Sequence, residues 1–192
     1  MCHIPDLHGV AQGVDHLLSP MGVLVFEEPY LGDMIKNTAY DQIYDEHVYI
    51  FSARSVINIF SKHGFELIDV KPQSTHGGSM RYILARKGKR AVSPSIEKQL
   101  HYEDKNNLHI KSTYDLFKKK CELSRKNLVS ILQQQKNDGR QVVGYAATSK
   151  STTVLNYCGI GPDLINFISD TTPIKQGKYT PGVHIPVLPY EE

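Results

Sequence analysis

The segment Asp41–Phe51, DQIYDEHVYIF, places a tyrosine, two acids and a histidine side by side, at Tyr44, Asp45, Glu46 and His47. An unperturbed histidine has a pKa of about 6.5, so a small shift makes it a base at neutral pH. A phenol can donate a hydrogen bond to a developing enolate oxygen. These residue types therefore suit the abstraction of a proton from a carbon next to a carbonyl group.

How these side chains are arranged depends on the element that carries them. If the segment is helical, Tyr40, Tyr44 and His47 lie on one face, because residues three and four positions apart are neighbours on a helix. The alternative is an aromatic helix face whose histidine has a purely structural role. The residues alone leave both interpretations open.

A second candidate is the glycine-bearing stretch THGGSMR, residues 75–81, between two strand-like runs. Two glycines allow the backbone to approach a ligand closely. His76, Ser79 and Arg81 could then bind a phosphate or a sugar. The alternative is an ordinary hairpin turn without a ligand.

The third candidate is GYAATSKST, where a strand and small residues precede Ser149, Lys150 and Ser151 at a predicted helix start. Free backbone N–H groups and the helix dipole favour a phosphate there. The spacing is neither that of a Walker loop nor that of a dinucleotide-binding fingerprint, which argues against an unrelated α/β oxidoreductase. An ordinary tight turn is the alternative.

Two further segments could contribute to a site. His3 follows a predicted strand, at the sheet edge where α/β folds place their ligands. The basic loop KQGKYTPGVHIP brings Lys175 and Lys178 and could close over an anion, or be a surface loop without a role. We predict no metal site, because the histidines and cysteines lack the local spacing of metal ligands.

The elements that must position these residues alternate between helix and strand. A helix is expected after HIPDL, a buried parallel strand at Val23–Pro29, and a helix capped by Ser52 and stopped at Gly64. The runs FELIDVKPQ and SMRYILARK suit an antiparallel hairpin. This order predicts the end of an α/β domain with a mainly parallel sheet, that is, part of a Rossmann-like domain.

The second half of the chain begins with a long helical pattern from about His109 to Lys136. A second Rossmann-like α/β unit follows, with strands at RQVVGY, INFISD and HIPVLP. We therefore expect three parts: an α/β domain at 1–90, a helical linker at 91–138, and a partial α/β domain at 139–192.

Composition restricts the classes of function. The net charge of +2 gives no bulk argument for nucleic acid or membrane binding. No apolar run approaches the roughly 20 residues of a membrane span. Cys2, Cys121 and Cys158 form no CxxC pair, and an odd number of cysteines argues against a disulfide framework. We expect a cytoplasmic protein whose ligand is a small molecule.

Together these segments resemble one family, the S-adenosylmethionine-dependent C-methyltransferases that act on nucleotide-linked keto-deoxysugars. The family's motifs HIPDL, FDxIYxEHxxYF, THGGSxR, LNYCGIG and KQGKYTPGxHIP all occur here in order, the second as YDQIYDEHVYIF. The likeness covers nearly the whole chain. It corresponds to the second half of the family's class I methyltransferase domain and most of its C-terminal Rossmann-like domain.

The resemblance implies a mechanism. His47 matches the base that removes the proton next to the sugar's 4-keto group, and Tyr44, Glu46 and His3 match its active-site companions. The enolate would then take the methyl group of S-adenosylmethionine. The family commonly has histidine at Asp45 and glycine at Ala146, so we give Asp45 no role, and the methyl group of Ala146 weakens the phosphate assignment.

The resemblance also implies that parts of the enzyme lie elsewhere. The cysteines of the family's N-terminal zinc domain have no counterpart here, and neither does the glycine-rich loop that holds S-adenosylmethionine. We therefore expect a fragment that is inactive alone, with no cofactor-binding residue assigned. The alternative is a non-catalytic nucleotide-sugar-binding module, or a half-enzyme that needs a partner carrying the N-terminal half and the cofactor site.

Overall fold

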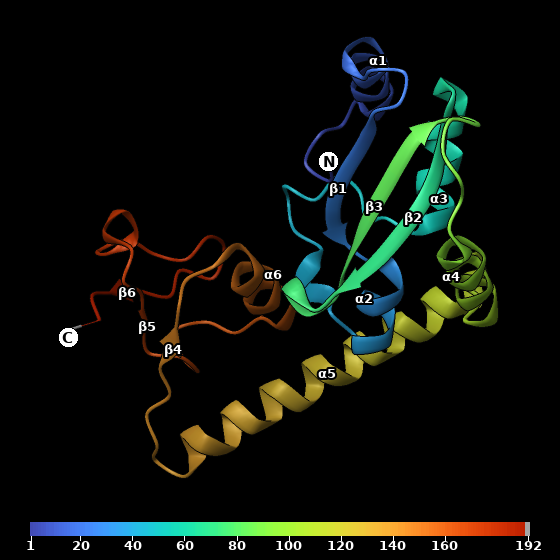
Figure 1. The fold of residues 1–192 in the computed structure, drawn as a ribbon. Helices are drawn as coiled ribbons and strands as arrows, with labels where there is room; N and C mark the ends of the chain where they lie inside the picture. The colour runs from blue at the N-terminus through green and yellow to red at the C-terminus, as the bar shows by residue number, and fades with distance from the viewer. Residues whose placement is uncertain (191–192) are drawn as a thin grey trace. The chain divides into compact units, whose positions relative to one another are not determined.

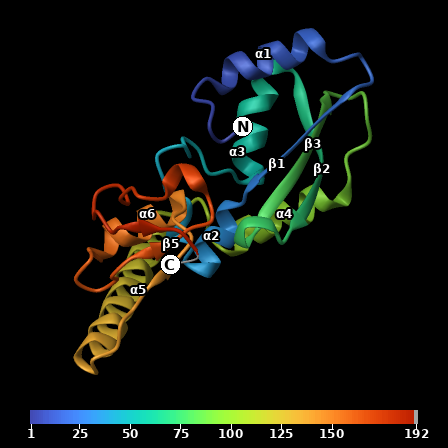
Figure 2. The ribbon, with the colours of Figure 1, turned by 90° about the vertical axis from the view of Figure 1, so that its left-hand side faces the viewer.

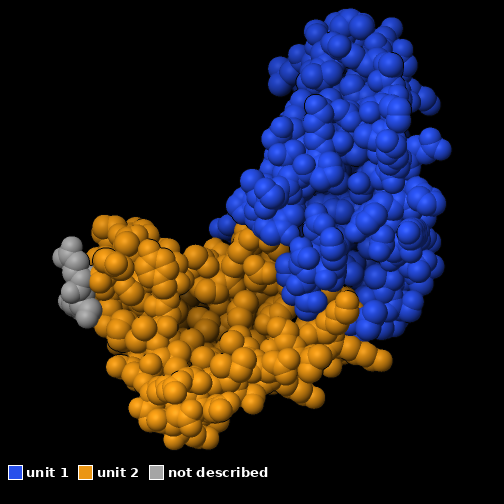
Figure 3. All heavy atoms as spheres, turned by 60° about the horizontal axis from the view of Figure 1, so that its bottom comes forward, with its two compact units in different colours: residues 1–39, 45–116 blue, residues 40–44, 117–192 orange. Residues whose placement is uncertain are grey.

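The computed structural model describes residues 1–190, which form two compact units (Figure 3). Unit 1 comprises Met1–Ala39 and Asp45–Leu116. Unit 2 comprises Tyr40–Tyr44 and the chain from Phe117 onward. Among the described residues, no helix combines the length and the apolar character needed to cross a membrane.

Unit 1 is built on a three-stranded sheet in the order β1-β3-β2 (Figure 1). Its strands are β1 (Val23–Pro29), β2 (Phe65–Gln73) and β3 (Ser79–Arg86). The central strand β3 pairs antiparallel with both neighbours, so β1 and β2 run in the same direction. The predicted antiparallel hairpin of β2 and β3 is confirmed.

The prediction for β1 was wrong in two respects. The strand pairs antiparallel with β3, and the side chains of Val23 and Val25 are 40% and 50% exposed. Within the described chain, β1 has a single neighbouring strand and lies at the sheet edge. A run of apolar residues indicates that a segment can form a strand. It does not indicate the direction of the neighbouring strand or how deeply the segment is buried.

Four helices accompany this sheet: α1 (Leu7–Leu17), α2 (Leu31–Asn37), α3 (Ala53–Phe60) and α4 (Pro94–Lys105). Figure 2 shows α1 passing across one end of α3, with which it is in contact. As predicted, Ser52 caps α3, in a reciprocal capping box with Ser55. The chain then passes through one 3-10 turn to Gly64, whose φ of 74° is the left-handed conformation that ends helices.

The core of unit 1 is rich in aromatic side chains. Phe26 packs against the rings of Phe51, Phe60 and Tyr82, at centroid distances between 5.1 and 6.0 Å. Tyr82 is fully buried. The packing therefore fixes Phe51 and α3, which follow His47 in the sequence.

The long helix predicted from the periodicity is confirmed as α5 (Lys111–Asn137). Its buried residues are Phe117, Cys121 and Leu132, whereas Ile131 is exposed. The predicted linker region also contains α4, which contacts β2 and α3 in unit 1.

Unit 2 contains the strand, loop and helix order that the sequence predicted. Its elements are β4 (Gly144–Tyr145), α6 (Ser149–Cys158), β5 (Ile168–Ser169) and β6 (Val187–Leu188). The strands form a parallel sheet in the order β4-β5-β6. A small core of buried apolar residues stabilises the unit, comprising Leu132, Leu155, Cys158, Ile160, Leu164, Ile168 and Ile185.

Candidate functional site

The segment that carries His47 is mostly not helical. Only Tyr40–Gln42 forms a 3-10 turn. The N–H groups of Val48 and Tyr49 donate to the carbonyl oxygen of Cys2, at 2.9 and 3.3 Å. These donors are therefore unavailable to a helix, which needs each N–H for a carbonyl four residues earlier. The condition under which Tyr40, Tyr44 and His47 would share one helical face is therefore not met.

This loop brings His47 next to His3. Their ring centroids lie 5.2 Å apart and the rings are tilted by 36°. The hydroxyl group of Tyr49 also donates to the carbonyl oxygen of Pro5, at 2.7 Å, which fixes the two segments a second time. His3 is exposed and His47 half-buried. The two predicted histidines thus form one accessible pair, although they are 44 positions apart in the sequence.

Cys2 lies close to this pair and is only 3% exposed. Its N–H donates to Glu28 Oε1 at 3.0 Å, at the end of β1. Burial, followed by the hydrogen bond and the negative charge of Glu28, raises the pKa of the Cys2 thiol to about 12. Ligand atoms of Cys2, His3 and His47 all lie within 4.8 Å of one another. The prediction of no metal site rested on local spacing, which cannot detect residues that the fold brings together.

The other predicted members of this centre are less closely defined. Glu46 is exposed, directly before His47. Tyr44 belongs to unit 2, and its role beside the base stays a prediction. Within unit 2, Tyr40 packs its ring 5.1 Å from that of Tyr157, and its hydroxyl group lies 3.7 Å from Cys158 Sγ. Burial, and then the contact with Cys158, raises the pKa of Tyr40.

The turn at residues 75–81 uses two of its predicted ligands to hold itself together. Ser79 is 1% exposed, and its hydroxyl group donates to the carbonyl oxygen of Thr75 at 3.0 Å. Arg81 binds Glu27, at 2.9 Å from Nη2. The hydrogen bonds from Thr75 and Arg81 lower the pKa of Glu27. His76 is exposed, with a φ of 54°, so a ligand at this turn would meet His76 first.

A cavity of about 380 Å³ opens at the start of α6. Its lining includes Ser149, Lys175 and Lys178, three of the residues predicted to bind phosphate, but not Lys150. Lys178 is exposed. Thr148 caps the helix by accepting a hydrogen bond from the Ser151 N–H. The structure thus gathers most of the predicted phosphate ligands around one cavity.

The charge of Lys175 is already partly neutralised. Its Nζ donates to the carbonyl oxygen of Ala147 at 2.7 Å and to Asp170 Oδ2 at 3.1 Å. Asp170 also accepts from the N–H groups of Ala147 and Thr172. The hydrogen bonds from Thr172, assisted by those from Lys175 and Ala147, hold the pKa of Asp170 well below its usual range. Lys175 therefore shapes the loop, which leaves Lys178 as the cation more exposed to a ligand.

Ala146 has a φ of 67°, in the left-handed region. Glycine adopts this conformation without cost, whereas other residues rarely do. The glycine that the resemblance implies at this position would therefore suit the backbone conformation, in addition to leaving room for a ligand. Its N–H donates to the carbonyl oxygen of Ser169 at 2.8 Å, so the strained residue is held by the sheet.

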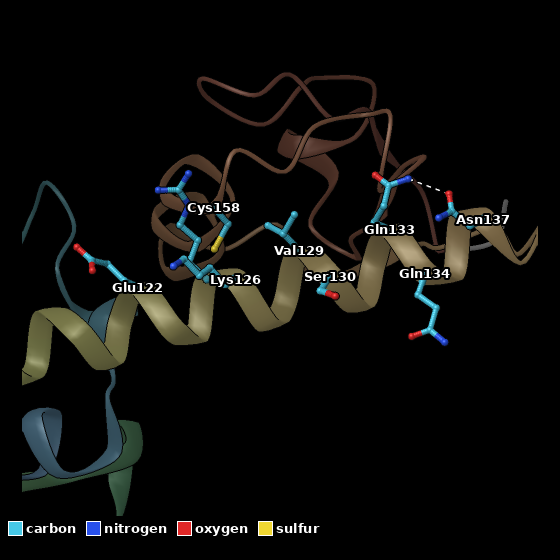
Figure 4. Close-up of a pocket in the computed structure, with 9 residues that line it drawn as sticks. Glu122, Lys126, Val129, Ser130, Gln133, Gln134, Asn137 and Cys158 are labelled. Atoms are coloured by element: carbon cyan, nitrogen blue, oxygen red, sulfur yellow. Dashed lines mark hydrogen bonds between the residues drawn. The ribbon is translucent and has the colours of Figure 1, made fainter.

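A second hollow, of about 740 Å³, lies along α5, next to Cys158 (Figure 4). Its lining is mainly polar and includes Gln133, whose amide donates to Asn137 Oδ1 at 3.0 Å. None of the predicted site residues line it. The sequence reading missed this hollow because it followed the apolar face of the helix, and polar residues on a helix normally indicate solvent.

Comparison with known proteins agrees with this arrangement. Residues 74–192 match the family described as "C-methyltransferase C-terminal domain". Residues 1–70 match the family described as "Methyltransferase domain". The boundary between the two matches falls at the end of β2, just before the turn that carries His76.

A curated relative extends the likeness over the whole chain. The C-methyltransferase NovU of Streptomyces niveus is 37% identical over 191 residues, which cover 99% of this chain and 46% of NovU. The chain thus spans about half the length of this relative. Since the first family match covers more than half of the chain, the protein belongs to the C-methyltransferase family.

Proposed function

We propose that the protein takes part in the transfer of a methyl group from S-adenosylmethionine to a carbon next to the keto group of a nucleotide-linked deoxysugar, with His47 as the base. The observation that carries this proposal is the accessible pair of His3 and His47 in a chain of the C-methyltransferase family. The polar turn around His76 and the cavity at α6 support it as places for the sugar and its phosphates.

The chemistry begins with a proton. His47 takes it from the carbon next to the carbonyl group, and the electron pair of the C–H bond forms the enolate. Tyr44 would donate a hydrogen bond to the enolate oxygen, while Glu46 and His3 stabilise the charged imidazole. General-base catalysis of this kind contributes about 10²–10⁴-fold in rate.

S-adenosylmethionine, which the family implies, would supply the methyl group. A cofactor of this kind needs glycines that face open space at a strand-to-helix turn. In unit 1, Gly32 and Gly78 are tightly packed against the side chains of Tyr30 and Asp33. These two glycines offer no such open turn. No cofactor-binding residue is therefore assigned in this chain, and the steps assigned to it concern the proton and the substrate alone.

The nucleotide would bind at the start of α6. Ser149 and the N–H groups of the first turn that Thr148 does not cap suit a phosphate, and Lys178 adds a positive charge at the same cavity. Lys150 and Lys175 would complete the positive field, with Lys175 acting through the loop that it holds. Of the three residues predicted at this turn, His76 is proposed to bind the sugar side of the substrate, while Ser79 and Arg81 hold the turn that presents it.

Proton abstraction can be tested without the cofactor. The chain is incubated in D₂O with a nucleoside-diphosphate-linked 4-keto-deoxysugar, and deuterium uptake next to the keto group is followed by NMR. His47→Asn should slow the exchange by about 100-fold or more. His101→Asn, an exposed histidine of α4, serves as the matched control and should exchange like the native chain.

Two results would contradict the assignment. Native rates of exchange in His47→Asn would remove His47 as the base. Binding of the nucleotide-sugar in a calorimeter without any deuterium uptake would favour the alternative, a non-catalytic nucleotide-sugar-binding module.

A further inference from the structure

We infer that Cys2, His3 and His47 form a binding site for Zn²⁺, and that the bound ion blocks His47. The site itself depends only on the geometry of these three residues. The inhibitory consequence rests on the proposed function, in which His47 is the base.

The distances allow one ion to reach all three ligands. Zinc binds sulfur at about 2.3 Å and histidine nitrogen at about 2.0–2.1 Å, so tetrahedral ligand atoms are separated by roughly 3.3–3.6 Å. Here the three ligand atoms already lie within 4.8 Å of one another. Closing the remaining gap takes a shift of roughly 1.3 Å, relative to the zinc distances. The exposed ring of His3 can supply it by rotation.

The backbone holds the ligands in place from both sides. The Cys2 carbonyl oxygen accepts from the N–H groups of Val48 and Tyr49, and the Cys2 N–H donates to Glu28. Two ligands therefore come from the first segment and one from the loop that is bonded to it. Because His3 is exposed, the fourth position of a tetrahedral ion would be open to water.

The donor set selects the kind of ion. One thiolate and two imidazoles suit zinc and other borderline metals, whereas Mg²⁺ and Ca²⁺ prefer oxygen ligands. A coordinating thiol is deprotonated by the metal, so binding should release a proton.

Unit 1 contains a second histidine pair that serves as an internal comparison. His8 Nδ1 and His63 Nε2 are joined directly by a hydrogen bond of 2.8 Å. Among the described residues, no cysteine joins this pair in a metal-ligand cluster, and its two nitrogen atoms already bind each other. The difference indicates that the thiol, rather than the proximity of two imidazoles, distinguishes the proposed site.

The ion would affect function through one lone pair. The imidazole nitrogen that coordinates zinc cannot accept a proton at the same time. Zinc should therefore suppress deuterium exchange next to the keto group of the substrate.

Cobalt offers a direct test, because Co²⁺ replaces Zn²⁺ at such sites and a Co²⁺–thiolate bond gives a charge-transfer absorption. Titration of the full chain with Co²⁺ should produce this absorption with one ion per chain, and Zn²⁺ should abolish it. Cys2→Ser should remove it. His3→Ala should weaken binding by at least about 100-fold. Losing a residue that only hydrogen-bonds to a metal ligand costs at most about this much, so a larger loss marks His3 as a ligand itself.

Control variants separate this site from the other thiols and histidines. The double variant Cys121→Ser, Cys158→Ser, whose cysteines are buried elsewhere, and His63→Ala should both keep the absorption. Since Cys2 is buried, Cys2→Ser is checked for folding by circular dichroism, while His3→Ala changes an exposed side chain and leaves the core intact. No absorption in the native chain, or full absorption in His3→Ala, would overturn the inference.

The two proposals fail separately. If cobalt binds as expected but His47→Asn still exchanges deuterium, the base assignment fails and the metal site stands. If exchange depends on His47 but cobalt gives no thiolate absorption, the metal site fails and the base assignment stands.

Discussion

Substitution of Glu103, whose carboxylate is buried in α4, should lower the stability of unit 1 more than substitution of any other polar residue there. Glu103 is 1% exposed and accepts hydrogen bonds from the N–H groups of Ala53 and Arg54, at 2.7 and 3.1 Å, and from the Tyr30 hydroxyl group at 3.2 Å. The first N–H groups of a helix have no partner within the helix. Glu103 therefore anchors the start of α3, a few residues after His47.

The magnitude follows from those contacts. A hydrogen bond to a charged group contributes about 1.5–3 kcal/mol, and a buried donor left without a partner costs about 1–3 kcal/mol. Glu103→Ala removes the acceptor from two backbone donors and from Tyr30. We expect the free energy of unfolding to fall by about 3–6 kcal/mol, roughly the loss of the two hydrogen bonds from the backbone N–H groups.

Glu103→Gln separates charge from shape. The amide keeps one oxygen that can accept from Ala53, but its NH₂ group faces the Arg54 N–H, donor against donor. An intermediate loss of about 1–3 kcal/mol is expected. Lys98→Ala, at an exposed position of the same helix, is the control and should change stability by less than about 0.5 kcal/mol.

Urea unfolding followed by circular dichroism measures these differences, with equal slopes showing that the transitions are comparable. If Glu103→Ala lost no more stability than Lys98→Ala, the carboxylate would not be anchoring α3. Glu103→Ala should also slow deuterium uptake next to the keto group of the substrate, because the loop with His47 leads directly into α3.

Two further predictions concern the turn in unit 1 and the loop in unit 2. Gly78 has a φ of 127°, and a Cβ there would collide with Asp33, so Gly78→Ala should destabilise the protein by more than the roughly 1–3 kcal/mol of backbone strain alone. Gly77 has open space around it, so Gly77→Ala should cost about 1–2 kcal/mol. The reverse order of the two variants in thermal unfolding would refute the contact with Asp33. Asp170 has a lowered pKa in the folded state, so its contribution to stability is present above its unfolded pKa of about 3.9 and is lost as the pH falls through the folded value. Asp170→Asn should therefore be less stable than the native chain at pH 7, and the difference should shrink on acidification; a difference that is independent of pH would contradict this linkage.

Elements with local signals were predictable from the sequence. Ser52 capped α3 as expected, because its hydroxyl group and the N–H of Ser55 are three residues apart. The glycine-bearing turn before Ser79 joined an antiparallel hairpin, and the periodicity of α5 gave its length. In each case the residues that decide the structure are close together in the sequence.

The parts that failed depend on distant residues. Helical spacing at Tyr40, Tyr44 and His47 was a reasonable pattern, but the carbonyl oxygen of Cys2 takes the N–H groups that a helix would use. No residue near His47 in the sequence indicates that the Cys2 carbonyl oxygen is the partner of this segment. The convergence of Cys2 and His47 was invisible for the same reason, although the sequence did single out both histidines of the pair.

The boundary between the compact units does not follow the order of the chain. Tyr40–Tyr44 belongs to unit 2, although it is flanked on both sides by segments of unit 1. Its Tyr40 ring packs on Tyr157, and the carbonyl oxygen of Ile43 accepts from Thr153 at 3.1 Å, both partners being in α6. Any single cut placed between 44 and 117 therefore removes these contacts from unit 2. The motif thus contains Tyr40, which packs in unit 2, and His47, the candidate base, which belongs to unit 1. Its mixture of aromatic and titratable residues therefore reflects both packing in one unit and chemistry in the other.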